Sequence, residues 1–398
     1  RWLTIDGNDE FFRLTKRIHN NLHGADGDGG TLDAREREVY ESTLAASAEE
    51  LAALVREGDV VYLHDPQTAG LAEELDALPI SIVWRCHVGL DTPTDHARRA
   101  WEFLRPYVEH ADAYVFSREA FAWEGLDRDR IWVVAPSIAA CPPKNQALEA
   151  PAVDAILGVA GLGPPGAGEP AFVRQSGEPG RVGRAAEIDQ DEPIATATPL
   201  VVQVSRWDRL KDHAGVLDAF TRHVRHPDAH LLLVGPSVAE VADDPEGAEV
   251  LAEMRGQRAA LPEDVRGRVH LACLPMDDVD ENAAMVNAIQ RRADIVLQKS
   301  LAEGFGLTVA EAMWKARPVI ASRIGGIQDQ IEDGVSGVLL DDPADLEAAG
   351  AAIDALLHDP DRARRIGDAA RESVRNSFLG TRHLIQYVQL LQQMLKVA

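Results

Sequence analysis

Residues 295–313, IVLQKSLAEGFGLTVAEAM, contain the stretch that decides the fold. Ile295–Gln298 have the composition of a buried strand, and a helix is expected to begin near Leu307. Between them, Gly304 and Gly306 permit a sharp turn that brings the backbone close to a ligand. A buried strand, a glycine turn and a helix in this order are typical of a parallel α/β sheet.

The same stretch carries the residue types of a binding site. Free N–H groups at the start of a helix form an anion site. Glu311, about one turn into the helix, could accept a pair of ribose hydroxyls, and Glu303 could accept hydroxyls of a sugar. The alternative is a surface junction with two solvated acids. A glycosidase acid pair fits poorly, because eight helical residues span about 12 Å and glycosidases need roughly 5 to 9.5 Å.

Short apolar runs alternate with amphipathic stretches on both sides of this motif. Most runs are continuously apolar, as expected of parallel strands covered on both faces. They are Val60–Leu63, Ile80–Trp84, Tyr114–Ser117 and Ile131–Val134, then Leu200–Ser205, His230–Gly235, Val269–Cys273, Ile295–Gln298, Pro318–Ser322 and Gly337–Leu340. The sequence therefore predicts an α/β chain of two doubly wound, Rossmann-like domains that face each other across a cleft.

The chain is expected to divide into four segments. Residues 1–157 would form an N-terminal Rossmann-like domain, and residues 200–380 a C-terminal one. Residues 158–199 are rich in Gly and Pro and poor in apolar residues, which predicts a linker. Residues 381–398 would form a helix that packs back on the N-terminal domain.

The beginning of the chain predicts an incomplete first sheet. Trp2–Ile5 have the composition of a strand, but no glycine-rich turn precedes them. We therefore expect the first strand and its turn to be missing, and several tens of residues to precede Arg1 in the natural protein. A sheet without that strand would have an open edge prone to association, for example as a homodimer.

Composition excludes several classes of protein. The net charge is -25, from 65 acidic and 40 basic residues, which argues against nucleic acid as the main partner. No apolar run approaches the roughly 20 residues that cross a bilayer, so we expect no membrane segment. Cys86, Cys141 and Cys273 are far apart and form no C-x-x-C pair. A disulfide framework is therefore not expected, and a cytoplasmic location fits best.

The loop after the first strand of the second domain supplies cations. In residues 204–212, VSRWDRLKD, Arg206 offers a bidentate fork for phosphate oxygens and Lys211 a compact charge. Both could stabilise a departing diphosphate. The loop has neither G-x-G-x-x-G nor a P-loop, and an ordinary charged loop is the alternative. Further on, Gly325 and Gly326 follow a strand and either approach a nucleotide or form a plain turn.

No metal site is expected. His19 and His23 have the i, i+4 spacing of a helical zinc pair, but no third ligand is evident. Residues 26–30, DGDGG, begin like a calcium loop, but the twelfth position, which needs Glu, is Arg37.

Three segments, taken in order, resemble the C-terminal half of the retaining GT-B glycosyltransferases of family 4. They are Ser205-Arg206 with Lys211, Glu303–Met313, and Ala321–Ile327. In the first domain, HDPQ at 64–67 and WRCH at 84–87 resemble the trehalose glycosyltransferring synthases and the related retaining trehalose phosphorylases. DEFF at 9–12 and TKRIHN at 15–20 resemble the same group.

The resemblance implies roles for particular residues. Arg206 and Lys211 would hold the diphosphate or phosphate, and Glu311 the nucleotide ribose. Asp65 and His87 would lie beside the acceptor and the donor ring, with His64 and Gln67 orienting the acceptor. The expected catalytic set is His87, Asp65, Arg206, Lys211 and Glu303, and the expected nucleotide-sugar-binding set is Arg206, Lys211, Phe305, Gly306, Leu307 and Glu311.

The expected reaction moves glucose from an NDP-glucose (ADP-, UDP- or GDP-glucose) to free glucose and forms α,α-trehalose with retention. The resemblance implies a front-face mechanism without a covalent carboxylate nucleophile. No tightly bound cofactor is expected, and a divalent metal could stimulate without protein ligands. The alternatives are a retaining trehalose phosphorylase using glucose 1-phosphate, a family 4 transferase with another acceptor, and a catalytically silent nucleotide-sugar sensor.

Overall fold

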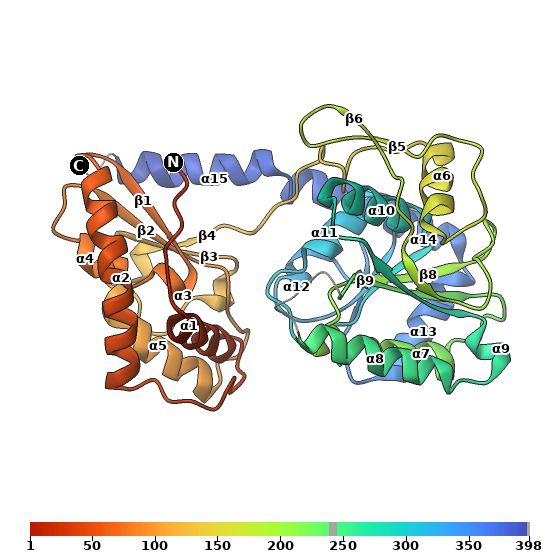
Figure 1. Ribbon diagram of the computed structural model, residues 1–398, viewed down its shortest axis with the longest axis horizontal. Helices are drawn as coiled ribbons and strands as arrows, with labels where there is room; N and C mark the ends of the chain where they lie inside the picture. Colours follow the sequence, from red (N-terminus) through yellow and green to blue (C-terminus); the bar gives the residue numbers. More distant parts are fainter. Residues whose placement is uncertain (239–244, 396–398) are drawn as a thin grey trace. The chain divides into compact units, whose positions relative to one another are not determined.

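The computed structural model describes residues 1–238 and 245–395, and it divides into two compact units (Figure 1). Unit 1 comprises Arg1–Pro136 and Thr381–Ala398, and unit 2 comprises Ser137–Gly380. Each unit has its own apolar core and its own sheet, which is parallel in unit 1 and parallel except for the edge strand β7 in unit 2. All ten apolar runs of the sequence form strands, so the prediction of an α/β chain is confirmed.

Unit 1 contains a four-stranded parallel sheet in the order β1-β2-β3-β4. Its strands are β1 (Val60–His64), β2 (Ser81–Cys86), β3 (Ala113–Phe116) and β4 (Ile131–Val133). Its helices are α1 (Asp9–Leu22), α2 (Ala34–Leu54), α3 (Asp65–Thr68), α4 (Leu71–Leu75), α5 (Asp95–Val108) and α15 (Gly380–Met394), with short 3-10 turns η1 (Glu119–Phe121) and η2 (Arg128–Arg130).

Alternate residues of these strands point to opposite faces of the sheet and join different cores. Leu63, Trp84 and Phe116 pack with α1, α2, α4 and α5 in the larger core. Val83 and Val115 pack on the other face with Leu390 of α15. Both faces of the sheet are therefore covered, which explains why its strands are apolar on both sides.

The expectation of a strand at Trp2–Ile5 is wrong. Residues 1–8, all within the described part of the chain, form neither helix nor strand. A strand needs a neighbour for its backbone hydrogen bonds, and no strand pairs with these residues. Trp2 is 82% exposed. Regular structure begins where the Asn8 side chain caps α1 by accepting from Phe11 N at 2.9 Å.

Unit 2 contains a seven-stranded sheet in the order β13-β12-β11-β8-β9-β10-β7. Its strands are β7 (Glu187–Asp189), β8 (Leu200–Val204), β9 (His230–Pro236), β10 (Val269–Leu274), β11 (Ile295–Gln298), β12 (Val319–Ser322) and β13 (Val338–Leu340), and β5 (Ala171–Val173) and β6 (Pro179–Arg181) form a separate hairpin. Its helices are α6 (Ala150–Ala160), α7 (His213–His223), α8 (Pro245–Ala259), α9 (Glu263–Arg266), α10 (Val279–Arg292), α11 (Leu307–Trp314), α12 (Ile327–Gln330), α13 (Leu346–Leu357) and α14 (Pro360–Ser377), with the 3-10 turn η3 (Arg209–Lys211).

Helices cover both faces of the second sheet as well. On one face, Val201, Leu231 and Leu271 pack with residues of α7, α8 and α13. On the other face, α10 packs against α6 and β8. A doubly wound sheet of this kind binds ligands outside the carboxyl ends of its strands. Those ends lead into the loops after β8, β11 and β12, where the sequence placed its candidate residues.

The Gly/Pro-rich segment 158–199, expected to be a linker, lies within unit 2 and carries β5, β6 and β7. Strand β7 pairs antiparallel with β10 at the edge of the sheet. Its acidic side chains contact Arg255 of α8, with Glu187 at 2.5 Å and Asp189 at 2.8 Å. These ion pairs order a polar segment whose composition alone suggests no packing. The unit boundary lies at Pro136 and not near residue 157.

No helix in the described ranges is long and apolar enough to span a membrane.

Candidate functional site

The glycine-rich turn of unit 2 follows β11 and ends at Gly306, the N-cap of α11. Gly306 has φ 82° and ψ 59°, a left-handed conformation that favours glycine. No side chain of the described residues caps this helix. The first turn of the helix therefore lacks a side-chain acceptor for its backbone donors, and Leu307 at its start is 45% exposed. This is the local geometry of an anion-binding helix start.

The second glycine pair lies directly against this turn. Gly326 N donates to Gly304 O at 2.8 Å. Gly325 has φ +49°, and a Cβ added to it would clash with the carbonyl oxygen of Glu303. Gln330 Nε2 donates to Phe305 O at 2.5 Å and fixes the same turn from α12. The glycines thus permit two loops to pack together, a role that the sequence left open between a nucleotide contact and a plain turn.

Two predicted residues of different loops meet in an ion pair. Lys211 Nζ lies 2.6 Å from Glu303 Oε2, and each side chain is 14% exposed. Ser300 Oγ donates to the same carboxylate oxygen at 3.5 Å. The pair joins the loop after β8 to the loop after β11 and leaves both groups accessible to a ligand.

A second, buried ion pair supports the first. Lys299, whose side chain is fully buried, pairs with the Asp212 carboxylate. Asp212 has φ 50° and caps α7 by accepting from Gly215 N at 3.1 Å. Lys211 precedes this strained residue, so the buried pair fixes the backbone beside Lys211. Sequence reasoning missed Lys299, although a lysine directly after a continuously apolar strand could have indicated it.

Arg206 does not join the Lys211–Glu303 pair. Its guanidinium contacts Asp208 of its own loop at 2.7 Å, and its side chain is 66% exposed. A contact two residues away in an exposed loop holds the side chain weakly. Arg206 can therefore reorient toward an anion at little cost.

Glu311 is 5% exposed and its two carboxylate oxygens have different surroundings. Oε1 lies 3.0 Å from Lys144 Nζ. Oε2 is buried and has no hydrogen-bond partner among the described residues. A buried acceptor without a partner is costly, about 1–3 kcal/mol, and it marks a place where a donor group of a ligand would fit.

The lysines of the chain concentrate here. The six lysines are Lys16, Lys144, Lys211, Lys299, Lys315 and Lys396, against a total of 40 basic residues. Four of them lie in unit 2: Lys211 and Lys299 in the loops after β8 and β11, Lys144 in the segment before α6, and Lys315 directly after α11. Lys144, Lys211 and Lys299 each pair with a carboxylate, so they place cationic groups among the candidate residues.

In unit 1, the candidate residues follow β1 and β2. Asp65 has φ 61° and begins α3. Its Oδ1 accepts from His87 N at 2.8 Å, and its carbonyl accepts from Trp84 Nε1 at 3.2 Å. His64 Nδ1 lies 3.3 Å from His87 Nε2, with the two rings stacked 5.6 Å apart. The structure therefore brings Asp65, His87 and His64 into one cluster.

The titration of this cluster is shifted by desolvation. The surrounding protein, and next the Arg85 cation, lower the pKa of His87 to about 4. Desolvation also lowers the pKa of His64 and raises the pKa of the Asp65 carboxyl, which the His87 N–H counteracts. His87 is thus a neutral imidazole at physiological pH, able to donate one hydrogen bond and accept another.

Arg85 is a further residue that sequence reasoning did not single out. It is fully buried, and its Nη1 donates to Val134 O at 2.7 Å. Burial lowers its pKa, and its hydrogen bonds go to carbonyl and hydroxyl oxygens. Its place in the motif WRCH, two residues before the predicted His87, could have been the signal.

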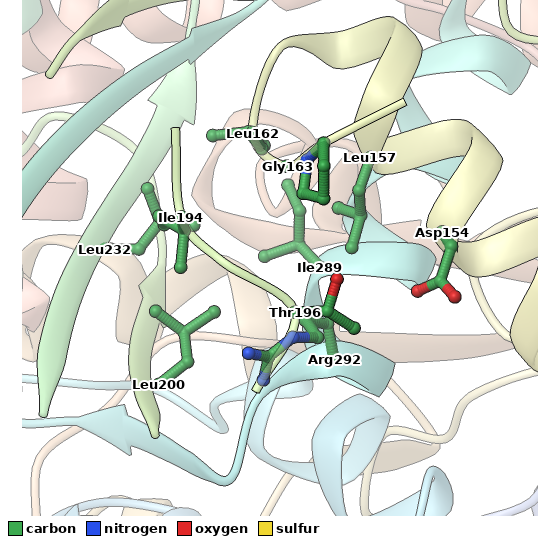
Figure 2. Close-up of a pocket in the computed structure, with 11 residues that line it drawn as sticks. Asp154, Leu157, Leu162, Gly163, Ile194, Thr196, Leu200, Leu232, Ile289 and Arg292 are labelled. Atoms are coloured by element: carbon green, nitrogen blue, oxygen red, sulfur yellow. The ribbon is translucent and has the colours of Figure 1, made fainter. Parts of the chain in front are cut away.

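A small cavity of unit 2 lies elsewhere (Figure 2). Its volume is about 30 Å³, and apolar side chains such as Leu157, Leu232 and Ile289 line much of it. None of the candidate residues contributes to it. A cavity of this size holds about one water molecule, so it is too small for a sugar nucleotide.

Residues 1–238 and 245–395 contain no group of three or more His, Cys, Asp or Glu side chains arranged to hold a metal ion.

Comparison with known families agrees with this arrangement. Residues 1–123 match the trehalose synthase N-terminal domain family, and residues 185–373 match the glycosyl transferases group 1 family. The α,α-trehalose-phosphate synthase (UDP-forming) from Burkholderia vietnamiensis superposes with a TM-score of 0.70 at 15% identity, over 98% of this chain and 84% of that one. The fold is GT-B, and the protein is a glycosyltransferase.

Similarity over the full length narrows the class. The trehalose synthase of Rubrobacter xylanophilus is 34% identical over 400 residues, covering 100% of this chain and 83% of its own. A trehalose phosphorylase of Pleurotus pulmonarius is 25% identical, over 94% of this chain and 50% of its own. The chain belongs to the trehalose synthase family.

Proposed function

We propose that this protein transfers glucose from a nucleoside diphosphate glucose to free glucose and releases α,α-trehalose and the nucleoside diphosphate. The observation that carries the proposal is the half-satisfied carboxylate of Glu311 beside the uncapped start of α11. A nucleoside diphosphate offers ribose hydroxyls to the first and phosphate oxygens to the second. Free inorganic phosphate or glucose 1-phosphate has no ribose to fill the Glu311 position.

The donor would be held by unit 2. Lys211 and Arg206 would pair with the diphosphate, and Glu303 would accept hydroxyls of the donor sugar. On binding, the diphosphate would replace part of the Lys211–Glu303 contact, which measures 2.6 Å. The exchange would therefore involve two side chains that already contact each other.

The acceptor would be held by unit 1. His87, neutral because its pKa is about 4, would hydrogen-bond sugar hydroxyls, and Asp65 would orient the acceptor and hold the His87 backbone. A neutral group suits this role, because a free glucose carries no charge to neutralise.

In the reaction, the acceptor hydroxyl oxygen forms a bond to the anomeric carbon while the bond from that carbon to the phosphate oxygen breaks. The acceptor proton passes to the departing phosphate oxygen on the same face, so configuration is retained. Arg206 and Lys211 stabilise the charge that grows on the diphosphate.

One screen tests the proposal. The full chain is incubated with glucose and with UDP-, ADP- or GDP-glucose, or with glucose 1-phosphate, and trehalose is measured by NMR. We expect trehalose with at least one sugar nucleotide. Trehalose from glucose 1-phosphate alone would identify a phosphorylase, the activity named for the Pleurotus relative. Consumption of a sugar nucleotide without trehalose would identify another acceptor.

A further inference from the structure

Lys144 contacts Glu311, a buried carboxylate of unit 2 with one unpaired oxygen. Its Nζ lies 3.0 Å from Glu311 Oε1, with 37% of the Lys144 side chain and 7% of the Glu311 side chain exposed. Glu311 Oε2 has no hydrogen-bond partner among the residues described. Lys144 therefore orients this carboxylate by one oxygen and leaves the other free.

The backbone on both sides of Lys144 is anchored to α10. Asn287 Nδ2 donates to Pro143 O at 2.8 Å and to Gln146 O at 2.9 Å. Asn287 is completely buried. A single buried amide thus holds carbonyls on both sides of Lys144, which fixes the backbone from which its side chain extends.

The next residue, Asn145, is anchored to α11 itself. Trp314 Nε1 donates to Asn145 O at 3.1 Å, and Lys315 Nζ donates to Asn145 Oδ1 at 3.0 Å and to Glu311 O at 3.0 Å. The segment that carries Lys144 is therefore tied to the helix that carries Glu311. An unrelated surface ion pair would have no such support.

Lys144 is the cation in the ion pair with the Glu311 carboxylate. Lys315 Nζ contacts the backbone carbonyl of Glu311. Burial lowers the pKa of Lys315 to about 7, so its amine is only partly charged near neutral pH. Lys144 is partly exposed and can contact a ligand as well as the carboxylate.

We propose that Lys144 is a nucleotide-recognition residue that holds Glu311 in place for the ribose diol and makes the site selective for ribonucleotides over 2′-deoxyribonucleotides. This inference rests on the proposed function, because it assumes a nucleoside diphosphate as ligand. A ribose diol supplies one hydroxyl to the open Glu311 oxygen and one oxygen to the Lys144 ammonium. A 2′-deoxyribose leaves one of these groups unpaired, and an unpaired polar group in a binding site rejects the analogue.

The test compares paired ligands by calorimetry. UDP and 2′-deoxy-UDP, followed by the adenine and guanine pairs, are titrated into the full chain and into Lys144→Met. We expect the variant to lose about tenfold in affinity for the ribonucleotide, the scale of one charge-assisted contact. Its affinity for the deoxynucleotide should change less than about twofold, so that the ratio of the two affinities approaches one.

Two further variants separate a role in recognition from a role in folding. Lys16→Met removes an exposed lysine of α1 in unit 1 and should leave both affinities unchanged. In the double variant Lys144→Met with Glu311→Ala, the loss of ribonucleotide affinity should be smaller than the two single losses combined, because Lys144 holds Glu311 and both bind the same diol. The ratio is measured within each variant, so a loss of folded protein does not change it.

The outcomes distinguish this inference from the proposed function. A Lys144→Met protein with the ribose selectivity of the unmodified chain would overturn the role of Lys144 and leave the proposed function intact. If the unmodified chain binds none of UDP, ADP and GDP, the proposed function fails and the inference with it.

Discussion

At the scale of single residues, Asp65 connects the two loops of unit 1. Its left-handed backbone, with φ 61°, places its carboxylate where it accepts the His87 N–H at 2.8 Å. A non-glycine residue in this region costs about 1–3 kcal/mol and persists where the surroundings impose it. The hydrogen bonds of His87 and Trp84 to Asp65 are that constraint, so Asp65 joins the two loops that carry the candidate residues.

His87 should be required for transfer and not for nucleotide binding. With its pKa lowered to about 4, the neutral form dominates above that pH, and protonation sets in only as the pH falls toward 4. We expect His87→Ala to abolish trehalose formation while the affinity for nucleoside diphosphate, measured by calorimetry, stays within about twofold. In the unmodified enzyme, titration of His87 should cause no change in turnover between pH 6 and 8. A structural role is indicated instead if the variant retains activity in proportion to its folded fraction.

Lys211 and Arg206 should act on the leaving group. Lys211→Ala and Arg206→Ala are each expected to lower turnover about 100-fold at saturating donor, the loss typical of a removed transition-state contact. Unfolding in urea should change little for Arg206→Ala, because its side chain is 66% exposed. Near-normal turnover in either variant would remove that residue from the catalytic set. Arg222→Ala, an exposed arginine of α7, is the control.

At the scale of elements, the glycine turns after β11 and β12 depend on each other. Gly325→Ala should be destabilising for two reasons: the residue has φ +49°, and its added Cβ would clash with the Glu303 carbonyl. We expect a loss of about 2–4 kcal/mol in the free energy of unfolding and weaker nucleotide binding. Gly334→Ala is the matched control, because Gly334 has φ +74° but no atom within 4 Å of an added Cβ.

Gly334→Ala should therefore show only the backbone cost, about 1 kcal/mol. Equal losses in the two variants, by urea denaturation, would mean that contact between the loops contributes nothing.

The strands were predictable because burial on both faces leaves a continuous apolar run, as in Ala113–Phe116, where all four residues are buried. Trp2–Ile5 have a similar composition and form no strand, because a strand also needs a partner and composition does not show one. Strand β7 shows the opposite: its composition predicts a linker, but it forms a strand. Glu187 and Asp189 are polar, and their order depends on Arg255, which lies in a later helix.

The site was predictable to a similar extent. Residues in the glycine turn and the cation loop stand out by their spacing after a strand. Lys144 and Lys299 did not, since each acts through a residue distant in sequence, Glu311 and Asp212 respectively. Their rarity was the available signal, because basic positions in this chain are otherwise nearly all arginine.

At the scale of the whole molecule, unit 1 is built from two separated parts of the chain. Leu390 of α15 is completely buried against Val83 and Val115, although about 275 or more residues separate them in sequence. The last helix therefore belongs to the core of the first sheet. Exposed residues on the same helix, such as Leu384 at 64%, do not contribute to that core.

Leu390→Ala should consequently destabilise unit 1 by about 2–5 kcal/mol, the range for a buried leucine. Leu384→Ala, the matched control, should change stability by less than about 0.5 kcal/mol. Calorimetry with and without nucleoside diphosphate would assign the transitions, because a ligand held by unit 2 raises the stability of that unit. An unchanged melting profile for Leu390→Ala would contradict the role of α15.

The discontinuity of unit 1 also has a consequence for biosynthesis. Residues 1–136 leave the ribosome before α15. The face of their sheet that carries Val83 and Val115 cannot pack against α15 until that helix is made. Unit 2 is continuous, so every one of its strands and helices is translated before that helix. Synthesis of unit 1 thus starts before that of unit 2 and ends after it. The exposed face of its sheet is where a nascent chain would bind a chaperone or aggregate.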